Sequence, residues 1–183
     1  QALAAQGNRP QIVAFITHSS DGGLTWLNPQ PITSGNWNTS EPDVAGGIRA
    51  AYVTWRDRRE ATSQIFVKRW DEITVSEDFH LATIGNCRRP SISALEPQVF
   101  VAWECSLNET TPVNIFASES KDRAEMWESA QQISFNTAES NVPHIVVRRD
   151  DAWVFWQDGT SGNQQVHFAQ HLQSGWTPAA QFT

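Results

Sequence analysis

Arginine is the residue type whose number and spacing in this sequence suggest chemistry. The 183-residue chain has 11 Arg against two Lys, and five of the Arg lie within residues 56–60 and 88–89. A guanidinium group donates two parallel hydrogen bonds and therefore suits a carboxylate. Arg58 and Arg59 are candidate ligand-binding residues on this ground. The alternative is that residues 56–60 form a solvated loop with local ion pairs.

Few other residues have the spacing of a catalytic or metal site. The five His are scattered singly, and two Cys are too few for a Cys-rich zinc site. Residues 158–163 form a Gly-rich turn rather than a phosphate-binding loop. The sequence therefore predicts no metal and no cofactor. A net charge of -7 disfavours nucleic acid, and the apolar runs are too short to span a bilayer.

Three prolines and three tryptophans at a fixed distance reveal an internal repeat. Thirteen residues separate the members of each pair: Pro42 and Trp55, Pro90 and Trp103, Pro143 and Trp156. Each Trp ends a β-rich run, and a second such run follows. Four short strands that repeat about every 50 residues are typical of a propeller blade. A β-sandwich is the alternative, but it would not require the fixed distance.

The repeat predicts an all-β chain of about three and a half blades, each of four antiparallel strands. Residues 1–41 are an incomplete blade with only its third and fourth strands, and 42–89, 90–142 and 143–183 are full blades. Closed rings have four to eight blades. We therefore expect an open arc, which the missing blades of a larger propeller or a second copy would complete.

Residues 19–26 read Ser-Ser-Asp-Gly-Gly-Leu-Thr-Trp. They resemble the Asp-box (BNR repeat), S-x-D-x-G-x-T-W, of the sialidase or neuraminidase family. The structural residues of this box are Ser19, Asp21, Gly23, Thr25 and Trp26. The Ser and Asp side chains can bond turn amides, the Gly allows a positive φ, and the Trp is expected to cap the hairpin against its blade. Residues 120–127 have the same spacing with two positions changed, which favours a decayed box over a short helix.

The resemblance implies a site on the face that carries the loops between fourth and first strands and between second and third strands. Sialidases use three Arg to hold the substrate carboxylate, an Asp as acid/base, and a Tyr activated by Glu as nucleophile. Residues 87–90, Cys-Arg-Arg-Pro, resemble the family's aromatic-Arg-Ile-Pro element. Arg88 then takes the Arg position, and Cys87 replaces the aromatic residue.

Two departures from the family pattern bear on activity. The only Tyr, Tyr52, lies inside a predicted strand and is expected to pack, and no third blade supplies an Arg at an equivalent loop position. These departures favour a structural or glycan- or partner-binding scaffold without a complete active site. The alternative is part of a sialidase-type exo-glycosidase whose remaining blades are missing from this chain.

Nine Trp against one Tyr suggest either a repeated structural position or a sugar-binding surface. The repeat accounts for six of them, at the end of the second strand or after the turn between third and fourth strands. Trp37, Trp70 and Trp153 remain. Only Trp37 lies in a predicted loop of the ligand face, so it is the candidate sugar-binding residue.

The two Cys occupy matching positions in one predicted hairpin. Cys87 lies three residues before Pro90 and Cys105 lies two residues after Trp103, so they face each other across the strand pair. We expect a disulfide, and hence an oxidising, extracellular or cell-surface location. The same positions in the other blades predict hydrogen bonds between Thr39 and Asp57 and between Ser140 and Asp158.

Overall fold

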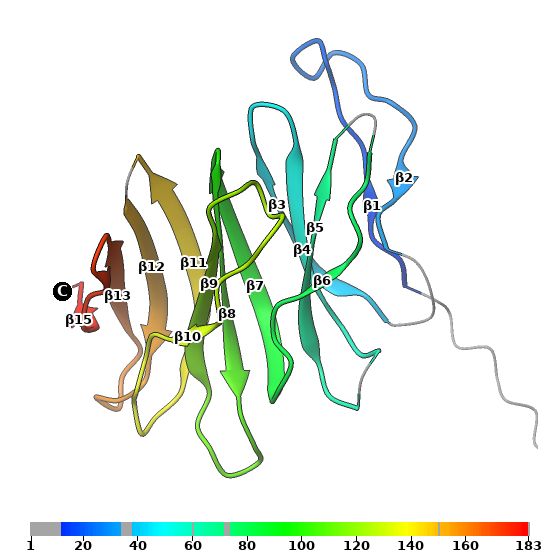
Figure 1. Cartoon of the computed structure of the whole chain (residues 1–183). Coiled ribbons are helices and arrows are strands. Elements are labelled where there is room, and N and C mark those ends of the chain that lie inside the picture. Colours follow the sequence, from blue (N-terminus) through cyan, green and yellow to red (C-terminus); the bar gives the residue numbers. More distant parts are fainter. Residues whose placement is uncertain (1–11, 34–37, 60, 72–73, 150, 183) are drawn as a thin grey trace, which may run out of the picture.

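The computed structural model describes residues 12–33, 38–59, 61–71, 74–149 and 151–182, and these contain strands and no helix (Figure 1). No helix in this part of the chain could therefore cross a membrane. The first sheet pairs β1 (Phe15–Ile16) with β2 (Gln30–Pro31). The second sheet contains β3 (Ser40–Gly46), β4 (Ala51–Asp57), β5 (Gln64–Trp70) and β6 (Phe79–His80).

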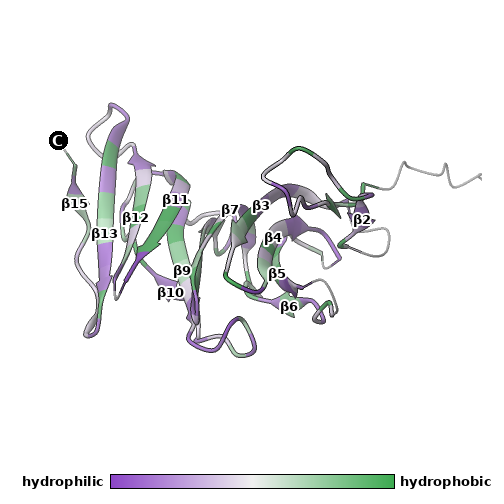
Figure 2. Cartoon of the chain, turned by 90° about the horizontal axis from the view of Figure 1, so that it is seen from above, coloured by the Kyte–Doolittle hydropathy of each residue, from purple (hydrophilic) through white to green (hydrophobic). Residues whose placement is uncertain are grey.

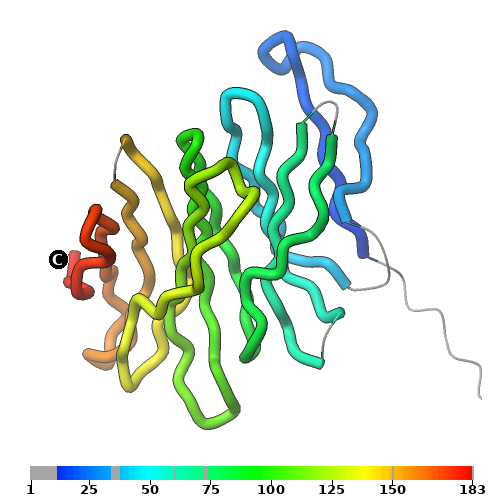
Figure 3. Tube along the Cα trace, in the orientation of Figure 1, coloured from blue at the N-terminus to red at the C-terminus, as the bar shows by residue number. Residues whose placement is uncertain are grey.

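The third and fourth sheets repeat this order. The third contains β7 (Asn86–Leu95), β8 (Gln98–Ser106), β9 (Asn114–Ser120) and β10 (Gln131–Gln132). The fourth contains β11 (Ser140–Arg148), β12 (Asp151–Asp158), β13 (Gln165–Leu172), β14 (Gly175–Trp176) and β15 (Ala180–Gln181). All pairings are antiparallel, and the sheets follow one another in chain order along an arc (Figure 3). The chain thus forms consecutive blades of a partial β-propeller.

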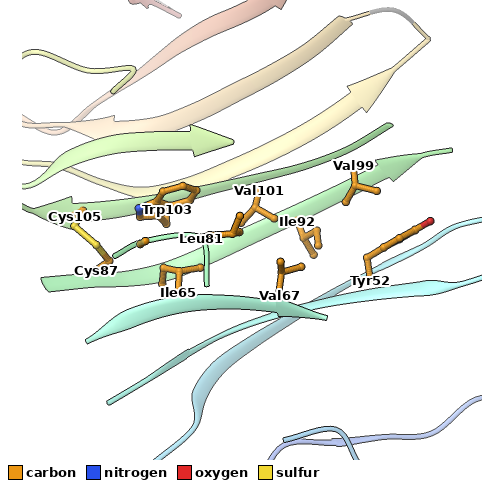
Figure 4. Close-up of a cluster of buried hydrophobic side chains, with 11 residues drawn as sticks. Tyr52, Ile65, Val67, Leu81, Cys87, Ile92, Val99, Val101, Trp103 and Cys105 are labelled. Carbon is orange, nitrogen blue, oxygen red and sulfur yellow. A yellow bond between two sulfur atoms is a disulfide. The ribbon is translucent and has the colours of Figure 1, made fainter. Parts of the chain in front are cut away.

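Neighbouring sheets are held together by apolar side chains from both. Ile32 of the first sheet shares a buried cluster with Trp55 of the second. Leu81 and Trp103 share the next cluster, which Figure 4 shows between the second and third sheets. Ile133 and Trp156 share the third cluster. The three Trp are 0 to 2% exposed. The repeated Trp therefore covers the fourth strand of the preceding sheet, and Figure 2 shows the hydrophobic stretch of β11 at such an interface.

The first strand of every full sheet contains a bulge next to its proline. The register shifts between Ser40 and Asp43 in β3, and the same shift occurs in β7 and β11. The residue before each proline has a left-handed backbone, with φ of 53° at Glu41, 49° at Arg89 and 54° at Val142. A bulge redirects the side chains around it. These three positions therefore project from the sheets at the same end of adjacent strands, since β3 contacts β7 and β7 contacts β11.

Two turns between third and fourth strands have the same geometry despite their different sequences. In residues 19–26 the Gly23 amide donates to Ser19 Oγ (2.8 Å) and the Thr25 amide to Asp21 Oδ1 (2.9 Å). In residues 120–127 the amides four residues after Ser120 and Asp122 make the same bonds, at 2.8 and 2.9 Å. Residues 120–127 thus form a turn and not a helix. Ala124 takes the left-handed conformation that Gly23 adopts in the first turn, with φ of 65° and 92°.

Trp26 does not cap its hairpin as the sequence led us to expect, because its side chain is 62% exposed. The equivalent Trp127 packs against Phe79 of the preceding sheet, with ring centroids 6.2 Å apart. The structure describes no sheet before β1 and β2. Trp26 therefore lacks the neighbour that covers Trp127.

The ends of the first two strands of each sheet are tied differently in each case. Cys87 and Cys105 are paired in register and form a disulfide. In the fourth sheet Ser140 Oγ donates to Asp158 Oδ2 (2.9 Å). In the second sheet the expected Thr39–Asp57 bond is replaced, because the Thr39 hydroxyl donates to Thr33 (3.3 Å) and Asp57 accepts from Arg59 and Trp55.

Asp21 gives a pH-dependent contribution to stability. Hydrogen bonds from Thr25 and Ser19 hold the pKa of its carboxyl well below the usual value of 3.8. A carboxyl with a lowered folded-state pKa stabilises the fold at higher pH, and this contribution is lost as the pH falls toward the folded-state pKa. The difference in unfolding free energy between wild type and Asp21→Asn is therefore expected to be largest above about pH 5 and to shrink toward about pH 2. Urea unfolding across that range measures it, and a constant difference would contradict the assignment.

Candidate functional site

Charged side chains from two neighbouring sheets meet where the first strands begin and the second strands end. This is the face that the resemblance assigns to ligands. We call the group the Arg–Glu cluster, and its members are Glu41, Arg56, Arg88, Arg89 and Glu104. Glu41 and Arg89 are the left-handed residues of the β3 and β7 bulges, so the bulges bring their side chains into the group.

Glu104 is the centre of the Arg–Glu cluster. Its carboxylate is 0% exposed and accepts hydrogen bonds from Arg88 Nε and from Arg89 Nη1 (2.9 Å). It also accepts from the Val142 amide of the fourth sheet (2.7 Å). A buried charge is tolerated only when it is paired and hydrogen-bonded. Glu104 therefore fixes the two guanidinium groups and ties the third sheet to the fourth.

Glu41 makes the corresponding bridge between the second and third sheets. Its carboxylate accepts from Arg56 Nη1 (3.0 Å) and from the Arg89 amide (2.7 Å). Glu41 and Glu104 thus both bond Arg89. The side chains of Arg88 and Arg89 are 39% and 46% exposed. Each guanidinium therefore presents further N–H donors to solvent at a position fixed by the buried carboxylate.

Arg58 and Arg59 are held on their own sheet by local contacts, as the ion-pair alternative predicts. Arg59 pairs with Asp57 (2.6 Å) and Asp78 (2.7 Å), and its guanidinium lies 3.8 Å from the centroid of the Phe66 ring. Arg58 Nε donates to Ser63 Oγ (3.1 Å). These contacts hold Arg59 against the Phe66 ring. Arg88, in contrast, is held by Glu104 of the neighbouring strand in the third sheet.

Tyr52 lies at the opposite end of its strand from the Arg–Glu cluster. It is the second residue of β4, whereas Arg56 is the last but one. The Tyr52 side chain is 0% exposed, and its hydroxyl donates to Glu96 Oε1 (3.0 Å). Burial, together with the Glu96 carboxylate, raises the pKa of Tyr52 well above its usual value. Tyr52 therefore packs between sheets and cannot attack a ligand bound at the cluster.

Two of the larger hollows of the molecule lie away from the Arg–Glu cluster. A cavity of about 880 Å³ lies between His18 and the β3–β4 turn, and one of about 360 Å³ is lined by the disulfide and Trp103. Neither is lined by residues of the cluster. In the described part of the chain no group of three or more His, Cys, Asp or Glu could hold a metal ion. Trp37 lies outside the described residues.

Sequence reasoning singled out Arg88. It placed Glu41, Arg56, Arg89 and Glu104 within loops of the expected ligand face but gave none of them a role of its own. The available signal was positional. Glu41 and Arg89 each precede a repeat proline, and Glu104 follows a repeat Trp within a β-rich run. A charged residue next to a repeat proline or tryptophan is therefore expected at the end of a strand, on the face that the resemblance assigns to ligands.

Comparison with solved structures shows similarity to β-propeller glycoside hydrolases. A Penicillium chrysogenum α-L-arabinanase, solved with arabinobiose, has a TM-score of 0.62 and 10% identity over 94% of this chain and 59% of its own. Trypanosoma rangeli sialidase, solved with sialic acid, has a TM-score of 0.61 and 11% identity over 96% and 33%. A family 117 glycoside hydrolase of Zobellia galactanivorans has a TM-score of 0.57 and 9% identity over 78% and 54%.

These similarities establish the propeller fold and not a reaction, because the identities are low. No family model matches the sequence, and no curated protein matches it. The chain spans little more than half the length of the arabinanase and of the family 117 enzyme.

Removing the charge of Glu104 tests its role at the centre of the Arg–Glu cluster. Glu104→Gln weakens three charge-assisted hydrogen bonds, from Arg88, Arg89 and the Val142 amide, and is expected to lower the free energy of unfolding by about 2 kcal/mol. The matched Glu41→Gln change affects a half-exposed carboxylate and is expected to cost less than about 1 kcal/mol. Urea unfolding followed by circular dichroism measures both, and equal costs would show that Glu104 is not the centre.

Proposed function

We propose that this chain is a segment of a sialidase-like Asp-box propeller that binds an acidic glycan at the Arg–Glu cluster, as a scaffold without a complete active site. One observation carries the proposal. Arg88 and Arg89 are fixed by the buried Glu104, yet they keep donors exposed on the ligand face. A glycan carboxylate suits such fork-shaped donors.

The same surface also offers acceptors for sugar hydroxyl groups. The Glu41 side chain is 35% exposed, and its carboxylate accepts a hydrogen bond from the Arg89 amide, which keeps it next to Arg89. Donors and acceptors in fixed positions reduce the entropy lost when a ligand is ordered. The chemistry of the site therefore favours a sugar that carries a carboxylate over a neutral sugar.

Three further features support this assignment. The turn at residues 19–26 has both the sequence of an Asp-box and a hydrogen-bonded geometry that its Ser and Asp explain. The Cys87–Cys105 disulfide favours an oxidising compartment, in agreement with a secreted or cell-surface protein. Tyr52, the residue type that sialidases use as nucleophile, is buried at the other end of its strand.

Isothermal titration of the protein with sialic acid, and with neutral arabinobiose as the comparison ligand, tests the site. We expect the acidic sugar to bind more tightly, and Arg88→Ala or Arg89→Ala to weaken its binding about tenfold or more, because each change removes charge-assisted hydrogen bonds. Arg148→Ala is the matched control, since Arg148 is exposed at the end of β11 that lies away from the cluster.

Equal losses in Arg88→Ala and Arg148→Ala would indicate only non-specific attraction by positive charge. Preference for arabinobiose would reject the acidic class of ligand. Circular dichroism of each variant distinguishes a lost contact from a lost fold.

A second candidate, part of an exo-glycosidase, is favoured by the presence of two carboxylates at Arg89. Glycoside hydrolysis commonly uses a pair of carboxyl groups flanking the scissile bond. The Glu104 carboxylate already accepts hydrogen bonds from Arg88, Arg89 and the Val142 amide, so its role is to position the arginines. Glu41 is the more accessible carboxylate of the two.

Turnover of fluorogenic sialosides and arabinofuranosides separates the two candidates. As a scaffold the protein is expected to release no fluorophore above the uncatalysed background. If turnover occurs, and Glu41→Gln abolishes it while sialic acid still binds, the protein is a hydrolase and the scaffold proposal is wrong.

A further inference from the structure

The loop between β8 and β9 contains a sequence motif that the proposed function does not use. Residues 108–110 read Asn-Glu-Thr, and residues 38–40 read Asn-Thr-Ser. Both match the acceptor motif for N-linked glycosylation, Asn-x-Ser/Thr with x other than proline. A motif this short also arises by chance. The surroundings of each asparagine therefore decide whether it can serve as an acceptor.

The side chain of Asn108 is held through its oxygen atom. Oδ1 accepts hydrogen bonds from the Thr110 hydroxyl (2.8 Å), the Thr110 amide (2.9 Å) and the Thr111 amide (3.0 Å). Because a backbone amide only donates, these bonds also settle which end of the side-chain amide is the oxygen and which is the nitrogen. Among the described residues Asn108 Nδ2 has no hydrogen-bond partner. The atom that carries a glycan is therefore free, and the motif hydroxyl lies next to the same amide.

The loop that carries Asn108 is ordered by its own side chains and is exposed. The Asn108 amide donates to the Thr111 hydroxyl (3.1 Å), and the Ser106 hydroxyl donates to the Thr111 carbonyl (2.9 Å). Residues 107–110 are all exposed, and Figure 1 shows the loop extending beyond the end of β8. A glycan attached to Nδ2 therefore displaces no buried side chain.

The second motif has a different environment. Asn38 is exposed, but Thr39 is 4% exposed and donates its hydroxyl to Thr33 (3.3 Å). Ser40, whose hydroxyl completes the motif, is the first residue of β3 and pairs with Arg56. Its Oγ is buried. The folded strand therefore covers the hydroxyl that this motif requires.

We propose that Asn108 is an acceptor for N-linked glycosylation and that Asn38 is not. In the transfer, Asn108 Nδ2 forms a bond to the anomeric carbon of an oligosaccharide carried on a lipid diphosphate. The bond between that carbon and the diphosphate oxygen breaks, the lipid diphosphate leaves, and Nδ2 gives up one proton. The proposal rests on a secretory route for the chain, which the Cys87–Cys105 disulfide favours.

Secretion of the 183-residue chain from cultured eukaryotic cells, behind an added signal peptide, tests the acceptor. We expect a mass above the 20.5 kDa of the chain, and peptide N-glycosidase should remove the excess. The enzyme converts the modified asparagine to aspartate, so peptide mass spectrometry locates the site. Asn108→Gln is expected to abolish the excess mass. Asn38→Gln is the matched control and is expected to retain it.

A second pair of variants keeps the test valid if Asn108→Gln fails to fold. Thr110→Ala removes the motif hydroxyl and is expected to lose the glycan, whereas Thr110→Ser keeps a hydroxyl and is expected to retain it. Wild-type protein secreted at 20.5 kDa would overturn the proposal. So would an excess mass that Asn38→Gln removes and Asn108→Gln leaves unchanged, because the acceptor would then be the other motif.

Discussion

The contact between a tryptophan and the fourth strand of the preceding sheet is the interaction on which the rest of this structure depends. Each full sheet is a few short strands wide and has an apolar surface on both sides, so it cannot bury both surfaces alone. Trp55, Trp103 and Trp156 solve this in the same way at three interfaces. Since each Trp is large and almost fully buried, the position and order of the sheets follow from these three contacts.

Stacking of the sheets also creates the Arg–Glu cluster. The left-handed residues before Pro90 and Pro143 adopt a conformation that costs non-glycine residues free energy. Their amides, which the bulges release from the strand ladder, are satisfied by carboxylates of the preceding sheet, Glu41 and Glu104. The same two carboxylates orient the arginines. One arrangement therefore both compensates the bulges and leaves cationic donors exposed to solvent.

The sequence was sufficient to predict the blades because the proline lies beside the bulge, and the tryptophan packs against the preceding sheet, in every repeat. It also paired Cys87 with Cys105, since strand pairing depends on position along one hairpin. The same register pairs Arg88 with Glu104, although sequence reasoning did not draw that pair. It could not place Arg89, because the register shifts between Arg88 and Ser91, or Val142, because that residue comes from another sheet. Contacts between sheets are set by stacking, which spacing along the chain does not encode.

Position rather than residue type decides what the single tyrosine does. Tyr52 forms the tyrosine–glutamate hydrogen bond that the sialidase resemblance leads one to look for, yet its partner Glu96 belongs to the β7–β8 turn of the next sheet. The pair is buried where two turns meet, and Gly47 lies so close to Glu96 that a Cβ there would clash with the carboxylate. A tyrosine held neutral by burial in such a contact stabilises the interface between sheets. Arg88 and Arg89, at the opposite end of the same interface, instead keep their guanidinium groups exposed to solvent.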